Sequence, residues 1–81
     1  MKPDVLLLLG QRIRKERKTI GLSQEELAER ANIDRSYIGG VERGERNLTF
    51  KILCQLCEAL GCDVAHLTNE IPKHLITKDQ R

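Results

Sequence analysis

Hydrophobic positions recur at helical spacing in the first twenty residues of the chain. Leu6, Leu9, Ile13 and Ile20 fall on one stripe, as the 3.6-residue period of an α-helix requires. The carboxylate of Asp4 can accept a hydrogen bond from a backbone N–H of the first turn and so cap this helix. The pattern predicts a helix that begins after Asp4 and continues to about Ile20.

Arg17 falls on the same apolar stripe and needs an explanation. A guanidinium in a protein interior requires a partner, because an uncompensated buried charge is costly. The alternative is that the aliphatic part of Arg17 packs on the core while its charged end reaches water. The spacing of the stripe leaves both interpretations open.

Two short amphipathic segments follow, joined by a tight turn. Ser23 and Glu26 have the spacing of a capping box, which predicts a helix from Gln24. Small side chains on one face of this helix would allow a second helix to approach closely. That apolar face carries Leu27, Ala28 and Ala31.

Residues 32–34 predict a turn, because Asn and Asp favour turn conformations. Asp34 can cap a second helix over residues 35–43, in which Ile38 and Val41 are expected to be buried. Two glycines inside a helix cost about 1 kcal/mol each relative to alanine, so we expect them on an exposed face that another surface approaches closely. That face has no apolar side chain and carries Arg35, Ser36, Gly39, Gly40 and Arg43.

The last third of the chain predicts two more helices. Thr49 can cap a helix over residues 50–60 that Gly61 ends, and Asp63 can cap a short helix over residues 64–67. Aromatic residues are only 2% of the chain, so the core must come from aliphatic side chains, which suits packed helices. The fold class is therefore predicted to be all-α, a compact five-helix domain with a helix-turn-helix motif at about residues 23–43. The core-facing side of the longer helix carries Leu53, Leu56, Cys57 and Leu60.

Charge and composition limit the classes of function. The chain has 14 basic and 12 acidic residues, a net charge of +2, so any nucleic-acid surface must come from local arrangement. The longest apolar run, residues 5–9, is far shorter than the ~20 residues of a membrane span. Three cysteines are an odd number for a disulfide framework, so we expect a cytoplasmic protein. Basic side chains gather locally at Arg35, Arg43, Arg46 and Lys51.

Several segments resemble the phage-repressor-like, Cro/XRE-type helix-turn-helix family. The resemblance implies a lambda-repressor-like DNA-binding domain over residues 9–67, followed by a short tail over residues 68–81. It also implies that Arg17 pairs with Glu42 and ties the first helix to the end of the motif's second helix. The segments that carry it are residues 24–28, the pair Ile38 and Val41, residues 42–44 and residues 56–61.

Residues 34–38 and 43–49 are most similar to the controller proteins of restriction–modification systems, which are small dimeric autoregulators. This resemblance implies a sequence-specific transcriptional regulator that binds double-stranded DNA at a near-palindromic operator as a homodimer. It implies no cofactor and no small-molecule ligand. By the same resemblance, the dimer contacts lie around Leu60, Cys62, Val64, His66 and Leu67.

Arg35 and Ser36 open the second helix of the motif, and the N-terminal residues of such a helix contact base edges in the major groove. Arg35 can donate two hydrogen bonds to guanine O6 and N7. Gln24 resembles the family residue that holds a phosphate and braces this helix, and Arg46 resembles one that contacts phosphate or enters the minor groove. Further phosphate candidates are Ser23, Tyr37, Arg43, Asn47 and Thr49.

Each of these candidates also has a structural interpretation. Arg43 and Lys51 can be solvated charges, Tyr37 can belong mainly to the core, and Ser23 and Asn47 can act only as helix caps. Phage repressors often add base contacts at the positions that Gly39 and Gly40 occupy here. Readout would therefore depend more on Arg35, Ser36 and the deformability of the DNA.

Other chemistries have weaker support. Cys54, Cys57, Cys62 and His66 include enough ligand types for zinc or a thiol switch, but free cysteine also packs as a small hydrophobic residue, so no metal site is predicted. The two histidines have no evident nucleophile partner, so no enzymatic activity is expected. The alternative function is an antitoxin-like protein-interaction module that uses residues 68–81 to bind its partner.

Overall fold

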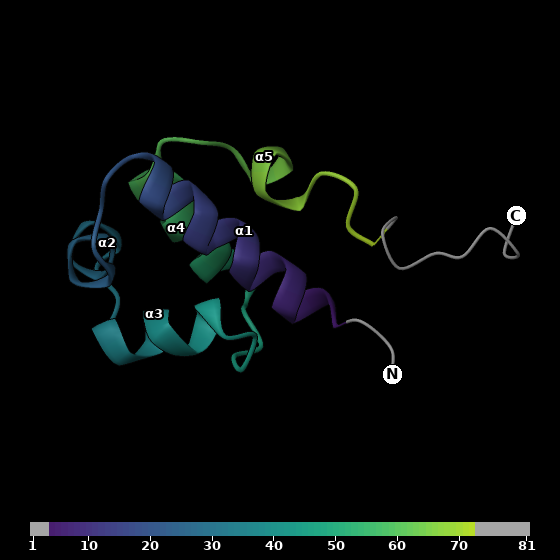
Figure 1. The fold of residues 1–81 in the computed structure, drawn as a ribbon, viewed down its shortest axis with the longest axis horizontal. Coiled ribbons are helices and arrows are strands. Elements are labelled where there is room, and N and C mark those ends of the chain that lie inside the picture. Colours follow the sequence, from purple (N-terminus) through teal and green to yellow (C-terminus); the bar gives the residue numbers. More distant parts are fainter. Residues whose placement is uncertain (1–3, 73–81) are drawn as a thin grey trace, which may run out of the picture.

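The computed structural model describes residues 4–72, in which five helices and no strand are present (Figure 1). This confirms the predicted all-α class. Part of the predicted tail, residues 73–81, lies outside the described residues. The helices are α1 (Val5–Thr19), α2 (Gln24–Ala31), α3 (Arg35–Glu42), α4 (Phe50–Leu60) and α5 (Val64–Thr68).

Side-chain caps set the helix starts where the sequence predicted them. The Ser23 hydroxyl accepts a hydrogen bond from the Glu26 backbone N–H at 3.0 Å, and the Glu26 carboxylate accepts one from the Ser23 N–H at 2.8 Å. These two bonds form the predicted capping box, and they lower the pKa of Glu26. The remaining helices have Asp4, Asp34, Thr49 and Asp63 as their N-caps.

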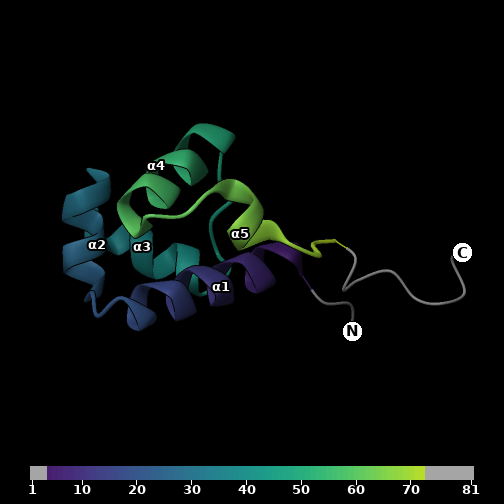
Figure 2. The same ribbon diagram turned by 90° about the horizontal axis from the view of Figure 1, so that it is seen from above.

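The helices pack around α1 and α4. α1 contacts α3 and α5, while α4 contacts α2 and α5, and α2 contacts α3. Figure 1 shows α3 and α5 on opposite sides of α1, and Figure 2 shows α2 at the C-terminal end of α1. Each helix contributes one fully buried large side chain to the common core: Ile13, Leu27, Ile38, Leu56 and Leu67.

The apolar stripe of α1 differs from the prediction at its C-terminal end. Ile20 is 40% exposed, because α1 ends at Thr19 and the chain turns at Gly21, which has φ +79°. Leu22, after the turn, packs in the core in its place. The buried positions of α1 are Gly10, Ile13 and Arg17, whereas Leu6 and Leu9 are only half-buried.

Gly10 allows α1 and α3 to approach each other closely. A Cβ atom at this position would lie 2.3 Å from the carbonyl oxygen of Val41 and 2.8 Å from that of Glu42. Both are backbone atoms, so they cannot move aside without shifting α3. The position of α3 relative to α1 therefore depends on a glycine that the sequence pattern did not single out.

Candidate nucleic-acid interface

The turn before α3 fixes the start of this helix. Asn32 has a left-handed conformation, with φ 58° and ψ 47°, and the Ile33 N–H donates to the Ala28 carbonyl at 2.9 Å. Asp34 accepts a 3.0 Å hydrogen bond from the backbone N–H of Ser36 and a second, short bond from its hydroxyl. Both bonds lower the pKa of Asp34, and the bond from the hydroxyl has the larger effect. The Ser36 hydroxyl therefore already has an acceptor within the protein.

Arg35 is the first residue of α3 and its side chain is exposed. It makes no hydrogen bond or ion pair with any residue between 4 and 72. Its five N–H donors are therefore available to an external acceptor. A free guanidinium can donate two parallel hydrogen bonds, which is what bidentate recognition of guanine requires.

Gly39 and Gly40 are buried, which corrects the prediction that they lie on an exposed face. The side chains of two arginines cover them. A Cβ atom at Gly39 would lie 3.1 Å from Nη1 of Arg43, and one at Gly40 would lie 3.0 Å from Cγ of Arg46. The glycines thus make room for arginine side chains that lie along α3.

Arg46 also contacts the aromatic ring of Tyr37. The carbon between its guanidinium nitrogens lies 5.2 Å from the ring centre, within the range of a cation–π interaction. Tyr37 is half-buried and packs partly against the core. Both predicted roles of this residue, a core contact and a place on the interface, are therefore compatible with its position.

Arg17, Glu42 and Gln24 connect three helices. Arg17 donates from Nε to Oε2 of Glu42 at 2.7 Å and from Nη2 to Oε1 at 3.0 Å, and its Nη1 donates to the Leu22 carbonyl at 2.8 Å. Gln24 donates to Oε1 of Glu42 at 3.0 Å. Arg17 and Glu42 are buried, so the structure contains the buried ion pair and not the solvated Arg17. The hydrogen bonds to Glu42 raise the pKa of Arg17.

The other phosphate candidates lie around this cluster and along the loop after α3. Ser23 and Thr49 accept cap hydrogen bonds, but each hydroxyl keeps a proton that it can donate. Asn47 is exposed and is not a helix cap, since Thr49 caps α4. Arg43 forms a 3.1 Å ion pair with Glu45, which raises its pKa, yet the two side chains are 62% and 59% exposed. Such an exposed pair is weak and exchanges readily.

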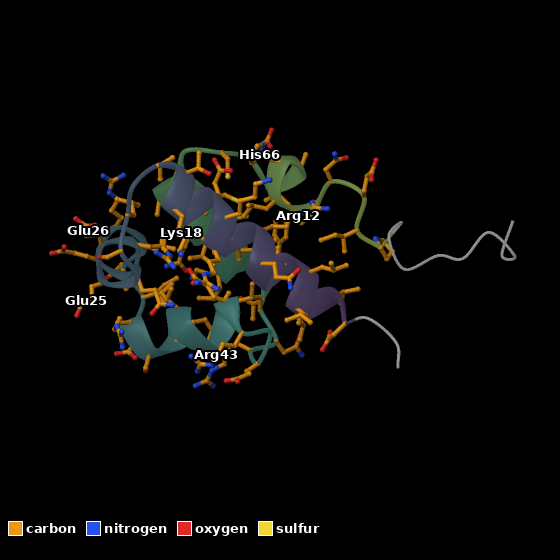
Figure 3. All side chains as sticks on the ribbon, viewed as in Figure 1. Arg12, Lys18, Glu25, Glu26, Arg43 and His66 are labelled. Atoms are coloured by element: carbon orange, nitrogen blue, oxygen red, sulfur yellow. The ribbon has the colours of Figure 1, made fainter. Side chains whose placement is uncertain are left out.

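Arg43 lies at the C-terminal end of α3, whereas His66 lies on the opposite side of the molecule (Figure 3). The candidate interface thus has three components from different parts of the chain. These are the start of α2, the exposed side of α3 and the loop over residues 43–49. Glu25 and Glu26 point outward from α2, away from Arg43 (Figure 3).

The residues predicted for the dimer contact divide into two groups. Leu60 and Leu67 are only 4% and 0% exposed, because they pack in the core of the subunit itself. They offer little surface to a second copy, and their part in a dimer contact stays a prediction. Cys62 and Val64 are half-buried and His66 is exposed, so these three can reach a partner.

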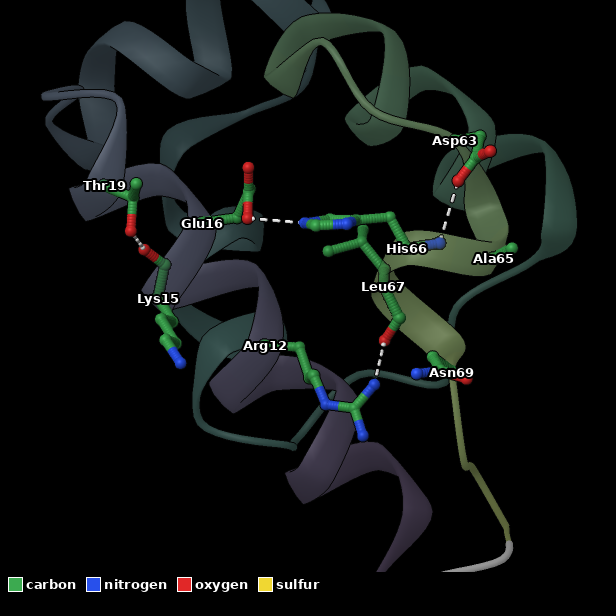
Figure 4. Close-up of a pocket in the computed structure, with 9 residues that line it drawn as sticks. All are labelled: Arg12, Lys15, Glu16, Thr19, Asp63, Ala65, His66, Leu67 and Asn69. Atoms are coloured by element: carbon green, nitrogen blue, oxygen red, sulfur yellow. Dashed lines mark hydrogen bonds and ion pairs between the residues drawn. The ribbon is translucent and has the colours of Figure 1, made fainter.

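Two side-chain contacts hold α5 on α1 (Figure 4). Nε2 of His66 lies 2.9 Å from Oε1 of Glu16, and Nη1 of Arg12 donates to the Leu67 carbonyl at 3.0 Å. Both contacts join residues more than 45 positions apart in the chain. They keep the accessible side of α5 in a fixed place.

The cysteines show no disulfide within residues 4–72, and no group of three potential metal ligands comes together there. Burial raises the pKa of the Cys57 thiol to about 12 and also raises that of Cys62. The thiolate is the form that binds metal and attacks disulfides, so these shifts disfavour both reactions. No helix among the described residues is long and apolar enough to span a lipid bilayer.

Several known proteins are similar to this chain in sequence and fold. The model of the helix-turn-helix family HTH_3 matches residues 13–67. The control protein C.SmaI of Serratia marcescens is 44% identical over 64 residues, which are 79% of this chain and 76% of that protein. The restriction–modification controller protein C.AhdI of Aeromonas hydrophila has 47% identity and a TM-score of 0.75 over 76% of this chain and 94% of its own.

A third relative has been solved with DNA. It is the restriction–modification controller protein C.Esp1396I, as a tetramer in complex with its natural 35 base-pair operator. It has 33% identity and a TM-score of 0.79, over 94% of this chain and 100% of that one. On the family match and these similarities, the chain belongs to the Cro/XRE-type helix-turn-helix family of DNA-binding transcriptional regulators and is most similar to restriction–modification controller proteins.

Proposed function

We propose that this regulator is a controller protein that binds a near-palindromic operator in double-stranded DNA as a homodimer. The observation that carries the proposal is the exposed side of α3, which presents an unpaired Arg35 at its start and Arg43 and Arg46 along its length. The similarity to controller proteins, one of them solved on its operator, supports the same function. The regulator needs no catalytic step and acts in the cytoplasm.

Arg35 and Ser36 contact the bases and read the sequence of the operator. Arg35 donates two hydrogen bonds to guanine, and one such bidentate pair discriminates against a wrong base by about 1–3 kcal/mol. The Ser36 hydroxyl must first exchange its hydrogen bond with Asp34, which makes its contribution smaller and adaptable to different bases. The glycines of α3 add no base contact, so the deformability of the DNA supplies further specificity.

Phosphate contacts position α3 in the groove. Gln24 braces the helix through Glu42 and still has a second amide N–H to donate. Arg46 leaves the ring of Tyr37 when it binds phosphate or enters the minor groove. The remaining phosphate contacts come from Ser23, Tyr37, Arg43, Asn47 and Thr49.

The homodimer places two copies of α3 on one face of the duplex. In dimeric helix-turn-helix proteins the two helices lie roughly 34 Å apart, which is one turn of DNA, so the operator is expected to be two-fold symmetric. Cys62, Val64 and His66 are the accessible residues of the predicted contact. A contact at α5 leaves α3 free, because the two helices lie on opposite sides of α1.

The salt dependence of binding tests the phosphate contacts. Each phosphate contact lowers the slope of log K against log salt by about 0.9, so six contacts reduce the affinity about a thousandfold between roughly 50 and 200 mM salt. Titration of a fluorescent duplex with protein at four salt concentrations measures this slope. An affinity that stays constant over this range contradicts the proposed interface.

A further inference from the structure

A hollow of about 310 Å3 lies between α1, α2 and α3. This volume is roughly ten times the ~30 Å3 that a water molecule occupies in the liquid. We refer to it as the three-helix hollow. Its lining residues are Arg14, Arg17, Gln24, Gly39, Glu42 and Arg43.

The charges in the three-helix hollow favour an anion. The single carboxylate of the lining, Glu42, is neutralised by Arg17, whose guanidinium donates to Glu42 and to the Leu22 carbonyl. The lining has two further cations, Arg14, which is unpaired within residues 4–72, and Arg43, whose only ion pair there is the weak, exposed one with Glu45. Gln24 contributes an amide group in addition, because only one of its N–H donors is used by Glu42.

Arg14 is the lining side chain of this hollow whose role the packing of residues 4–72 does not explain. It is exposed on α1 and makes no hydrogen bond or ion pair with any residue of the described part of the chain. It lies one helical turn before Arg17 and outside the helix-turn-helix motif. A second cation, Arg43, lies over Gly39 on the α3 side of the same hollow, where any larger residue than glycine would meet its guanidinium.

We propose that the three-helix hollow receives a phosphate group of the DNA backbone and that Arg14 is a ligand of this phosphate, together with Gln24 and Arg43. The inference rests on the proposed function and adds a contact from α1 to it. A phosphate there receives charge-assisted hydrogen bonds from side chains of α1, of α2 and of the residue that ends α3. Because phosphate contacts position a protein without reading sequence, Arg14 sets the register of α3 on the duplex.

The test compares Arg14→Gln with Lys15→Gln on the duplex that the wild type selects. Lys15 is the matched control, since it has the same charge on the same helix but faces the groove between α1 and α5 (Figure 4). Arg14→Gln is expected to reduce the salt slope by about 0.9 for each subunit bound and to weaken binding equally for all sequences, while Lys15→Gln retains the wild-type slope.

A set of duplexes with a neutral methylphosphonate at one backbone position at a time locates the phosphate. At one position in each half-site, neutralisation should weaken the wild type and Lys15→Gln but leave Arg14→Gln unchanged. If Arg14→Gln and Lys15→Gln respond alike at every position, the inference is wrong although the proposed function stands. If the wild type binds no duplex selectively, both are wrong.

Discussion

At the scale of single residues, glycines in α1 and α3 have different structural roles. At Gly10 the atoms that exclude a side chain are the backbone carbonyls of α3, with a Cβ-to-oxygen distance of 2.3 Å at Val41. At Gly40 they are atoms of the long, flexible side chain of Arg46. Gly10 therefore fixes the packing of two helices, whereas Gly40 leaves space for the side chain of Arg46.

We therefore predict opposite effects for alanine at these two positions. Alanine is favoured over glycine in a helix by about 1 kcal/mol, so Gly40→Ala should leave the free energy of unfolding unchanged or raise it by up to that amount. Gly10→Ala should lower it by about 1–3 kcal/mol or more, because α3 must move. Urea denaturation of the two variants measures both values. Equal stabilities would show that α1 and α3 do not approach as closely as described.

At the scale of helices, the buried contact of Arg17 with Glu42 joins α1 to the end of α3, and Gln24 adds α2. All buried side-chain polar atoms in the described residues have a hydrogen-bond partner. Removing one member leaves the others uncompensated, which costs more than the pair itself contributes. The orientation of α3 thus depends on a polar cluster as well as on the apolar core.

Arg17→Ala should lower the free energy of unfolding by about 3–5 kcal/mol, because it leaves the carboxylate of Glu42 buried without its counter-charge. A domain of this size has roughly 5–15 kcal/mol in total, so much of this variant would be unfolded on mild warming. Thermal denaturation followed by circular dichroism measures the loss. Arg14→Ala is the control and should change stability by less than about 0.5 kcal/mol, since its side chain is exposed and unpaired. A wild-type melting temperature for Arg17→Ala would contradict the buried pair.

The helix starts were predictable from the sequence because caps are local. Ser23, Thr49 and Asp63 each accept a hydrogen bond from a backbone N–H three residues further along. The misplaced features depend on where the chain turns and on where a long side chain lies, which helical spacing alone does not show. Ile20 is exposed because the chain turns just after α1, and Gly40 is buried because Arg46 folds back over it.

At the scale of the whole molecule, the candidate interface and the accessible part of α5 lie on opposite sides of α1. This separation lets one surface bind DNA while another binds a second copy. The place of Arg35, exposed at the start of α3, could be predicted because the motif lies within one continuous segment. Arg14 could not, since it is brought to the three-helix hollow only by the packing of α1 against α2 and α3.

The most direct test of the central claim is selection of bound sequences from a random DNA pool at near-physiological salt, with the wild type and Arg35→Ala in parallel. The wild type should enrich a two-fold symmetric motif whose half-site centres are about 10 base pairs apart. Arg35→Ala should enrich the same motif with a weakened preference for one guanine in each half-site. An asymmetric motif, or no enrichment by the wild type, would contradict a dimer that reads DNA through α3.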